Sequence, residues 1–238
     1  MRSDRKEFLR GFRDAFPVFV SYFAVSIALG ITARNIGFSP VAAGFMSLVN
    51  LTSAGQAAGL RIMAEQGTRI EIVLSQVAIN LRYMLMSAVL ATRLTENTGT
   101  GKRMLMGFGI TDEIFGLSAK NEALNPFYTV GCFCMATPGW VAGTVLGVVM
   151  GNLLPVKIVE ALSMALYGMF ISLVFSPAKK NYILFPVILF TMLSSYLLET
   201  FVPVVSFGMR VIFLTLGISA LAAVIFPVKA EKEDGEGV

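Results

Sequence analysis

Four polar side chains fall inside otherwise apolar stretches, where a charge is costly unless it is paired or wetted. Arg82 lies two residues after Asn80, and Asp112 is adjacent to Glu113. Ionisable residues at membrane depth cost several kcal/mol and mark functional sites by default. Pairing of Arg82 with one of the two carboxylates is consistent with a gate, with proton coupling or with a purely structural ion pair. We therefore take these four residues as candidate coupling or gating residues.

A second polar group occupies Asn50–Gln56, which reads Asn-Leu-Thr-Ser-Ala-Gly-Gln. So many polar and small residues favour an unwound segment, which is tolerated at membrane depth only where it lines a cavity or is buried in protein. The alternative is a packing face on which Ser53 and Gly55 let another helix approach closely. The larger amides of Asn50 and Gln56 need partners, which favours a discontinuous helix whose freed groups hold a substrate.

A third candidate lies in the uncharged stretch Ala123–Val156, which is too long for one straight span. Its Thr137-Pro138-Gly139-Trp140 segment resembles a helix start, because Thr is a good N-cap and Pro suits the first helical position. A helix N-terminus at mid-membrane would offer free N–H groups to a carboxylate. The alternative is a simple proline kink. Two interrupted spans are typical of secondary transporters.

The elements that must position these residues are membrane-spanning helices. Six long stretches contain no Asp, Glu, Lys or Arg: 16–33, 41–60, 123–156, 161–178, 181–198 and 211–228. A spanning helix needs about 20 mostly apolar residues. We expect an all-α, polytopic transmembrane bundle with interrupted helices and about eight spans, at 16–34, 41–60, 71–92, 103–120, 127–150, 157–177, 181–200 and 203–227.

The distribution of basic residues favours eight crossings over seven. With the N-terminus inside, eight crossings place twelve basic residues inside and five outside. The inside set is Arg2, Arg5, Lys6, Arg10, Arg13, Arg61, Arg69, Lys120, Lys179, Lys180, Lys229 and Lys232, and the outside set is Arg34, Arg93, Lys102, Arg103 and Lys157. If 103–120 does not cross, the split is eight against nine. Both termini are therefore expected in the cytoplasm.

The ends of the chain and one internal echo complete the organisation. Residues 1–15 form a basic segment expected to lie as a helix on the membrane surface, 16–228 form the transport domain, and 229–238 form a charged tail. Leu29-Gly30 recurs as Leu146-Gly147 at an offset of 117 residues. This echo leaves open an internal repeat, which eight crossings would make parallel and which would be inverted if 103–120 did not cross.

Composition excludes several classes of protein. The chain is 55% hydrophobic and 14% charged, with a mean hydropathy of +0.74. It has no histidine, and its two cysteines are expected to pack as small apolar side chains. There is no phosphate-binding loop and no credible nucleophile with a base, so we expect no enzyme activity, no metal and no cofactor. Basic residues lie in short caps between spans, which indicates lipid headgroups and not nucleic acid.

Several of these segments resemble one known family. Gly11-Phe12-Arg13-Asp14-Ala15 with Pro17 is similar to the opening of the AzlC (AzlC/BrnF) family, the large subunit of bacterial branched-chain amino acid exporters. Further matching segments are Phe38-Ser39-Pro40, Met46-Ser47, Gln56, Asn80-Leu81-Arg82, Thr111-Asp112-Glu113, Trp140, Gly143-Thr144 and Gly147. The resemblance covers residues 10 to about 175. Tyr83 stands where many members have His, and Leu51-Thr52-Ser53 replaces a more aromatic segment.

The resemblance implies export of leucine, isoleucine, valine or analogues across the bacterial cytoplasmic membrane. It also implies a small membrane subunit of the AzlD type as partner, with protons as the expected energy source. A channel for small solutes and a non-transporting assembly subunit remain alternatives, and a homo-oligomer is left open. The candidate substrate-binding residues are Asn50, Ser53, Gln56, Thr137, Gly139, Trp140 and Thr144.

Overall fold

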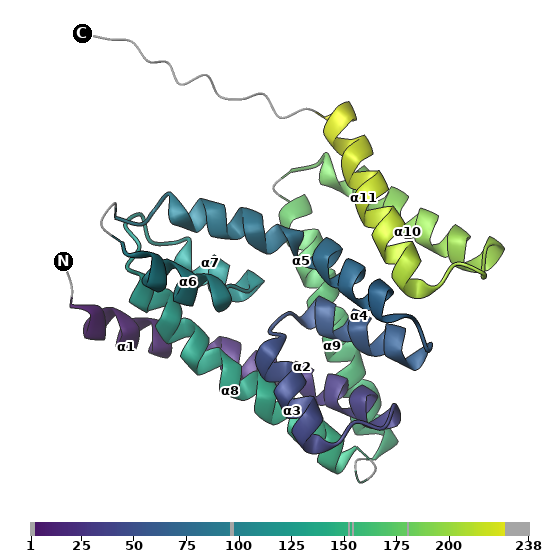
Figure 1. Ribbon diagram of the computed structural model, residues 1–238, viewed down its shortest axis with the longest axis horizontal. Helices are drawn as coiled ribbons and strands as arrows, with labels where there is room; N and C mark the ends of the chain where they lie inside the picture. Colours follow the sequence, from purple (N-terminus) through teal and green to yellow (C-terminus); the bar gives the residue numbers. More distant parts are fainter. Residues whose placement is uncertain (1–2, 96–97, 152, 154, 180, 227–238) are drawn as a thin grey trace.

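The computed structural model describes residues 3–95, 98–151, 153, 155–179 and 181–226, whose regular secondary structure is helical (Figure 1). Within α9, part of the side chains also lies outside the described set, as does the tail 229–238. The helices are α1 (Asp4–Asp14), α2 (Phe16–Asn35), α3 (Pro40–Val49), α4 (Ser53–Ala64), α5 (Arg69–Ala91), α6 (Thr100–Phe108), α7 (Asp112–Ser118), α8 (Pro126–Met150), α9 (Val156–Ala178), α10 (Leu184–Phe201) and α11 (Phe207–Ile225). The expected all-α membrane bundle is confirmed.

Short polar side chains start several of these helices. Thr68 begins α5 with a capping box, since its hydroxyl accepts from Glu71 N (3.2 Å) and the Glu71 carboxylate accepts from Thr68 N (2.7 Å). Ser39 caps α3 by accepting from Ala42 N (3.2 Å), and a proline occupies the first turn of α3 and of α8. The starts therefore follow from local sequence, even where the surrounding stretch is uniformly apolar.

The centre of the fold is a parallel pair of helices, α2 and α8, that meet along glycines. A Cβ at Gly30 would lie 2.1 Å from the carbonyl oxygen of Thr144, and one at Gly147 would lie 2.2 Å from that of Ile27. Gly143 approaches the Phe23 carbonyl in the same way. Later residues of α2 thus meet later residues of α8, and small residues allow the backbones to touch.

The glycines of the internal echo meet in this pair. Gly30 and Gly147, which correspond at the offset of 117 residues, lie against one another in reciprocal contacts. Beyond the pair the two halves differ, because α2 is followed by two short helices, α3 and α4, whereas α8 is followed by the long α9. The parallel relation is therefore present between α2 and α8 and does not extend to the helices that follow.

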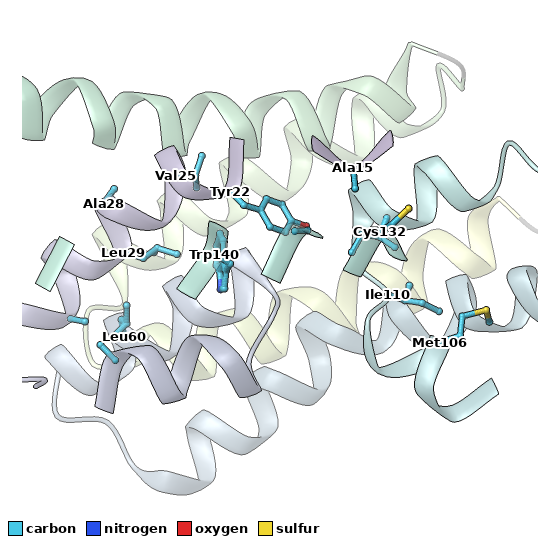
Figure 2. Packing of buried hydrophobic residues seen from close by; sticks show 14 of the residues in the cluster. Ala15, Tyr22, Val25, Ala28, Leu29, Leu60, Met106, Ile110, Cys132 and Trp140 are labelled. Atoms are coloured by element: carbon cyan, nitrogen blue, oxygen red, sulfur yellow. The ribbon is translucent and has the colours of Figure 1, made fainter. Parts of the chain in front are cut away.

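The helices α3 and α4 form a hairpin that enters and leaves at the same end of the bundle. We call this end, where α2 and α8 finish, the distal end. From there α3 descends along α8, with Gly44 against Val145 and Ser47 against Thr144. After the turn at 50–52, α4 returns until Leu60 lies near Leu29, close to the end of α2 (Figure 2).

The helices α6 and α7 form a second hairpin, which enters from the opposite, N-terminal end. Leu94 and Leu124, which flank this hairpin in the chain, are paired by a parallel bridge, so the segment leaves and returns at one level. On the way in, Phe108 packs edge-on against Phe133, and on the way out Ser118 hydrogen-bonds to Thr129 (2.9 Å). The turn of this hairpin lies at 109–111.

Two of the eight predicted spans do not form single long helices. Segments 41–60 and 103–120 are each broken into two short helices that double back. Among the described residues, five helices are long and apolar enough to cross a membrane, namely α2, α5, α8, α10 and α11. With α9, whose side chains are only partly described, at most six of the predicted spans remain.

The expected helix within residues 1–15 is present as α1, but it packs against α8 and is not simply laid on a surface. Glu7 is buried and pairs with Arg10 (3.1 Å), whose guanidinium also stacks over Tyr128 at 4.5 Å. At the outer edge, a hydrogen bond from Asn125 and the nearby Lys102 hold the pKa of the Asp4 carboxyl below its ordinary value. One face of α1 is thus fixed by polar contacts to the start of α8.

At the distal end, α10 and α11 attach to the rest of the bundle through charged and polar side chains. Glu199 pairs with both Arg61 (3.5 Å) and Arg210 (3.3 Å), and Glu71 accepts a hydrogen bond from Ser206. Away from this end, α10 buries none of its described residues and exposes large apolar side chains. Such a surface suits contact with lipid tails.

Candidate substrate and coupling site

The two hairpin turns point toward each other at mid-depth of the bundle. In the first turn Thr52 caps α4 by accepting from Gly55 N (3.2 Å), and in the second Thr111 caps α7 by accepting from Ile114 N (3.4 Å). Tyr83 of α5 lies between them, since its phenol interacts with Thr52 and donates a weak hydrogen bond to Asp112 (3.5 Å). The predicted break near Asn50 is confirmed, and it has a counterpart that approaches from the other end.

The first hairpin is held by a closed ring of neutral hydrogen bonds. Gln56 donates to Ser47 Oγ (2.8 Å) and accepts from the indole Nε1 of Trp140 (2.9 Å). Ser47 donates to Thr144 Oγ1 (2.8 Å), which donates in turn to the Trp140 carbonyl (3.0 Å). All four side chains are almost fully buried, at 0–1% exposure. The ring thus joins α3, α4 and α8 through groups that do not titrate.

The second hairpin is held by ionisable groups. The Arg82 guanidinium pairs with the Asp112 carboxylate at 3.0 Å, and it also lies over the Tyr83 ring. The Glu113 carboxylate lies 2.5 Å from the Tyr22 phenol, which also hydrogen-bonds to Thr111 (2.7 Å). Both carboxylates of the candidate pair are thus engaged, and among the described residues a salt bridge is formed by Asp112 and not by Glu113.

One aromatic pair connects the two hairpins. The rings of Tyr22 and Trp140 meet edge to face with centroids 5.2 Å apart. Trp140 bonds to Gln56 of the first hairpin, whereas Tyr22 bonds to Thr111 and Glu113 of the second. Figure 2 shows the pair between Leu60 on one side and Ile110 on the other. The α2–α8 core therefore contacts both turns directly.

A row of amides on α5 reaches the first hairpin from the other side. Asn80 donates to Gln76 (3.3 Å), which donates to the carbonyl of Gly55 (2.8 Å). The Asn80 Oδ1 and the Arg82 Nε are buried and have no hydrogen-bond partner among the described residues. These two groups are able to take a further polar partner at this depth, where an unmet hydrogen bond is costly.

The predicted half-helix at Thr137 is wrong. α8 runs unbroken from Pro126 to Met150, with Pro138 inside it, so no helix N-terminus is available to a carboxylate there. The alternative of a proline within one helix is correct. Gly139 is a packing residue, since a Cβ there would lie 2.6 Å from the carbonyl oxygen of Phe19. Thr137 is buried within the same helix.

The remaining predicted residues gather around the turns. Gln56, Trp140 and Thr144 belong to the buried ring, while Asn50 and Ser53 flank the first turn and are partly exposed. In this conformation the ring residues bind one another, so a substrate must displace these bonds to use them. The role of these residues in substrate binding stays a prediction.

Three functional candidates were missed in the sequence. Tyr22 sits in a uniformly apolar stretch and gives no signal of its own. Gln76 lies four residues before Asn80, a spacing that places two amides on one helix face, and this signal was available. Ser47 was noted only as part of a matching segment. No group of metal-binding side chains occurs among the described residues.

Several known membrane proteins resemble this chain in sequence. A family profile described as "AzlC protein" matches residues 17–154, which include both hairpins and the α2–α8 pair. The chain is 29% identical over 150 residues to the inner membrane protein YgaZ of Escherichia coli K12, covering 61% of each chain and thus less than two thirds of that relative. It is 28% identical over 178 residues to an uncharacterized membrane protein of Archaeoglobus fulgidus, covering 74% of this chain and 78% of the other. No solved structure matches.

Proposed function

Because the chain belongs to the AzlC family, we propose that it is the large subunit of a secondary transporter that exports branched-chain amino acids. The proposal includes leucine, isoleucine, valine and close analogues as substrates, proton movement as the energy source, and a small membrane subunit as partner. It rests on the family resemblance for the substrate class and on the two opposed hairpins for the mode of action.

The observation that carries the proposal is the meeting of two broken segments at mid-depth. Hairpins that enter from opposite ends of the bundle bring their turns to Tyr83, with polar and charged groups on both sides. Irregular backbone at membrane depth is tolerated where it is buried in protein or lines a cavity. Discontinuous helices at the midplane are the usual architecture of a carrier's substrate site.

The arrangement suits alternating access, since each hairpin closes the site from one side. Opening the first hairpin breaks the Gln56–Trp140 contact and exposes the site toward the distal end. Opening the second breaks the Arg82–Asp112 pair and exposes the site toward the N-terminal end. The shared Tyr22–Trp140 pair lets the position of one hairpin affect the other.

A zwitterionic amino acid finds complementary groups here. Its carboxylate is matched by the Arg82 guanidinium, whose Nε is free of described partners, and its ammonium by the Asp112 carboxylate or by amide oxygens such as that of Asn80. An apolar pocket separates ligands that differ by one methylene by only about 1–3 kcal/mol. Several branched-chain substrates should therefore be accepted.

The distribution of basic residues supports an orientation with α1 in the cytoplasm. With the hairpins taken into account, the described basic residues outside the site divide nine to five between the two ends. Those at the N-terminal end are Arg5, Lys6, Arg10, Arg13, Arg93, Lys102, Arg103, Lys120 and Lys179, and those at the distal end are Arg34, Arg61, Arg69, Lys157 and Arg210. In this orientation the start of α2 at Phe16 and the end of α11 at Ile225 both face the cytoplasm, and the protein lies in the bacterial inner membrane.

Leucine efflux from proteoliposomes tests the proposal. The chain is reconstituted with and without a small AzlD-type subunit, and efflux is followed with and without an imposed pH gradient. Saturable efflux that requires the partner and follows the gradient is the expected result. Non-saturating flux would indicate a channel, and an absence of flux for leucine, isoleucine and valine would refute the substrate assignment.

A further inference from the structure

The helix α1 stands upright beside the start of α8. An added Cβ at Gly11 would meet the carbonyl of Tyr128, and one at Gly131 would meet that of Phe8. These contacts continue the series that joins α2 to α8 at Gly139, so α1 and α2 follow α8 as one column (Figure 1). The 25 residues of α8 extend over about 38 Å, which exceeds the roughly 30 Å of hydrocarbon in a bilayer. The start of α8, with α1 beside it, therefore reaches the level of the lipid headgroups.

The face of α1 that lies toward α8 is occupied by contacts within the protein. Arg10 pairs with Glu7 at 3.1 Å and donates a hydrogen bond to Asn121. Asp14 accepts a hydrogen bond from the hydroxyl of Tyr128 at 3.1 Å. A further partner of α1 must therefore bind its opposite, outer face.

The outer face of α1 carries three cations. The side chains of Arg5, Lys6 and Arg13 are exposed and form no hydrogen bond or ion pair with another described residue. The acid adjacent to them in the sequence, Asp4, is paired with Lys102 at 3.4 Å. Among the described residues, the positive charge of the outer face is therefore not neutralised.

Large apolar side chains share the outer face with these cations. Leu9, Phe12 and Phe16 follow Arg5 at spacings of four, three and four residues, which places them on one stripe of the column. Their exposed fractions are 54%, 39% and 55%. A soluble anion or a nucleic acid would leave this stripe in water, whereas a phospholipid offers a phosphate to the cations and acyl chains to the apolar groups.

We infer that the outer face of α1 binds the headgroups of anionic phospholipids in the leaflet at the N-terminal end of the bundle. This face consists of Arg5, Lys6, Leu9, Phe12 and Arg13. The stems of Lys and Arg extend along apolar surface and bring their charges to the phosphates. An anionic leaflet attracts such basic segments within a Debye length. The inference does not depend on the proposed transport, and the orientation decides only that this leaflet is the cytoplasmic one.

Electron paramagnetic resonance with spin-labelled lipids tests this binding in the membrane. The full chain is reconstituted in phosphatidylcholine vesicles with a trace of spin-labelled phosphatidylglycerol or phosphatidylcholine, and the fraction of label that the protein immobilises is compared. The wild type should prefer phosphatidylglycerol, and the variant Arg5→Gln/Lys6→Gln/Arg13→Gln should lose most of this preference. Equal immobilisation of the two lipids by the wild type, or an unchanged preference in the variant, would overturn the inference.

Two further variants separate the outer face of α1 from the general charge and folding of the protein. Arg103→Gln/Lys120→Gln/Lys179→Gln removes three exposed cations at the same end but outside α1, and it should keep the preference. Arg5→Lys/Arg13→Lys keeps the charge on α1 and should keep the preference as well. A loss in the first of these as large as that caused by the α1 variant would indicate a general charge effect and overturn the assignment to α1.

Salt provides a second measurement of the same binding. Raising the ionic strength from about 0.01 M to about 1 M shortens the Debye length from about 30 Å to about 3 Å. The wild-type preference should then fall toward that of the α1 variant, and a preference that salt does not change would contradict binding through these cations. A chain that prefers phosphatidylglycerol but transports no branched-chain amino acid would refute the proposed function and leave this surface standing, so the two failures are distinguishable.

Discussion

The two hairpins perform the same geometric task with different chemistry. The α3–α4 hairpin is fixed by a ring of neutral groups, Gln56, Ser47, Thr144 and Trp140, that are almost fully buried. The α6–α7 hairpin is fixed by charges, with the Asp112 side chain 12% exposed and that of Arg82 30% exposed. Neutral bonds keep their strength as pH changes, whereas ion pairs and carboxyl groups do not. The α3–α4 hairpin is therefore suited to respond to substrate alone, and the α6–α7 hairpin to respond to protons as well.

The largest effect is expected from breaking the charged side. Asp112→Asn keeps the side-chain shape but leaves Arg82 without its ion-pair partner, and because the pair is only partly buried the cost lies below the value of about 3–5 kcal/mol for a fully buried pair. Leucine efflux should be abolished, while expression is retained because the α2–α8 core is separate from this pair. The control is Asp4→Asn, which removes a carboxylate from an exposed pair with Lys102 and should leave efflux unchanged. Wild-type efflux in Asp112→Asn would remove Asp112 from the mechanism.

The next largest effect is expected at the α2–α8 contact, which supports both hairpins. Gly147→Ala places a methyl group 2.2 Å from the Ile27 carbonyl, so α2 and α8 must separate, at a cost of about 3 kcal/mol. Thermal unfolding in detergent should shift to lower temperature, and both hairpins should loosen together. Gly107→Ala is the matched control, since nothing lies within 4 Å of its added Cβ. Equal melting temperatures for the two variants would contradict the close α2–α8 contact.

Breaking the neutral ring is expected to cost less stability than Gly147→Ala, and its effect on efflux should not depend on pH. Gln56→Ala leaves the Trp140 N–H without its acceptor and removes the N–H donor to Ser47, whose hydroxyl still donates to Thr144, at about 2 kcal/mol for the buried polar groups. Efflux should be lost at every pH tested. The exposed Gln66, with φ of 56°, offers the control Gln66→Gly. If the Gln56→Ala defect were rescued by a change in pH, the contrast between the hairpins would fail.

The smallest effect is expected from Tyr22→Phe, and it should be confined to the α6–α7 hairpin. Tyr22→Phe keeps the ring contact with Trp140 but removes the bonds to Thr111 and Glu113, worth about 1 kcal/mol. Hydrogen exchange measured by mass spectrometry should quicken for residues 105–118 and stay unchanged for 47–58. Faster exchange in both segments would show that the hairpins are not independently held.

Much of the fold could be predicted from the sequence because long hydrophobic stretches indicate which segments lie in the membrane. The break at 50–52 was visible as a cluster of polar residues, and the candidate pairing of Arg82 with Asp112 is confirmed by geometry. The second break was assigned to Pro138, where a strong local signal exists, but α8 accommodates this proline within one helix. The actual break at 109–111 carries only Gly109 and Thr111 as signals, inside a stretch read as a span.

The sequence by itself determined that the chain is an apolar helical bundle with a few charged residues at depth, since composition and length alone decide what can enter a bilayer. Only the tertiary structure decided which apolar segments cross and which double back. That choice depends on contacts between distant residues, such as Leu94 with Leu124 and Gly30 with Gly147. A hydrophobic segment of given length favours the bilayer in a hairpin as well as in a span, so local physics could not separate the two.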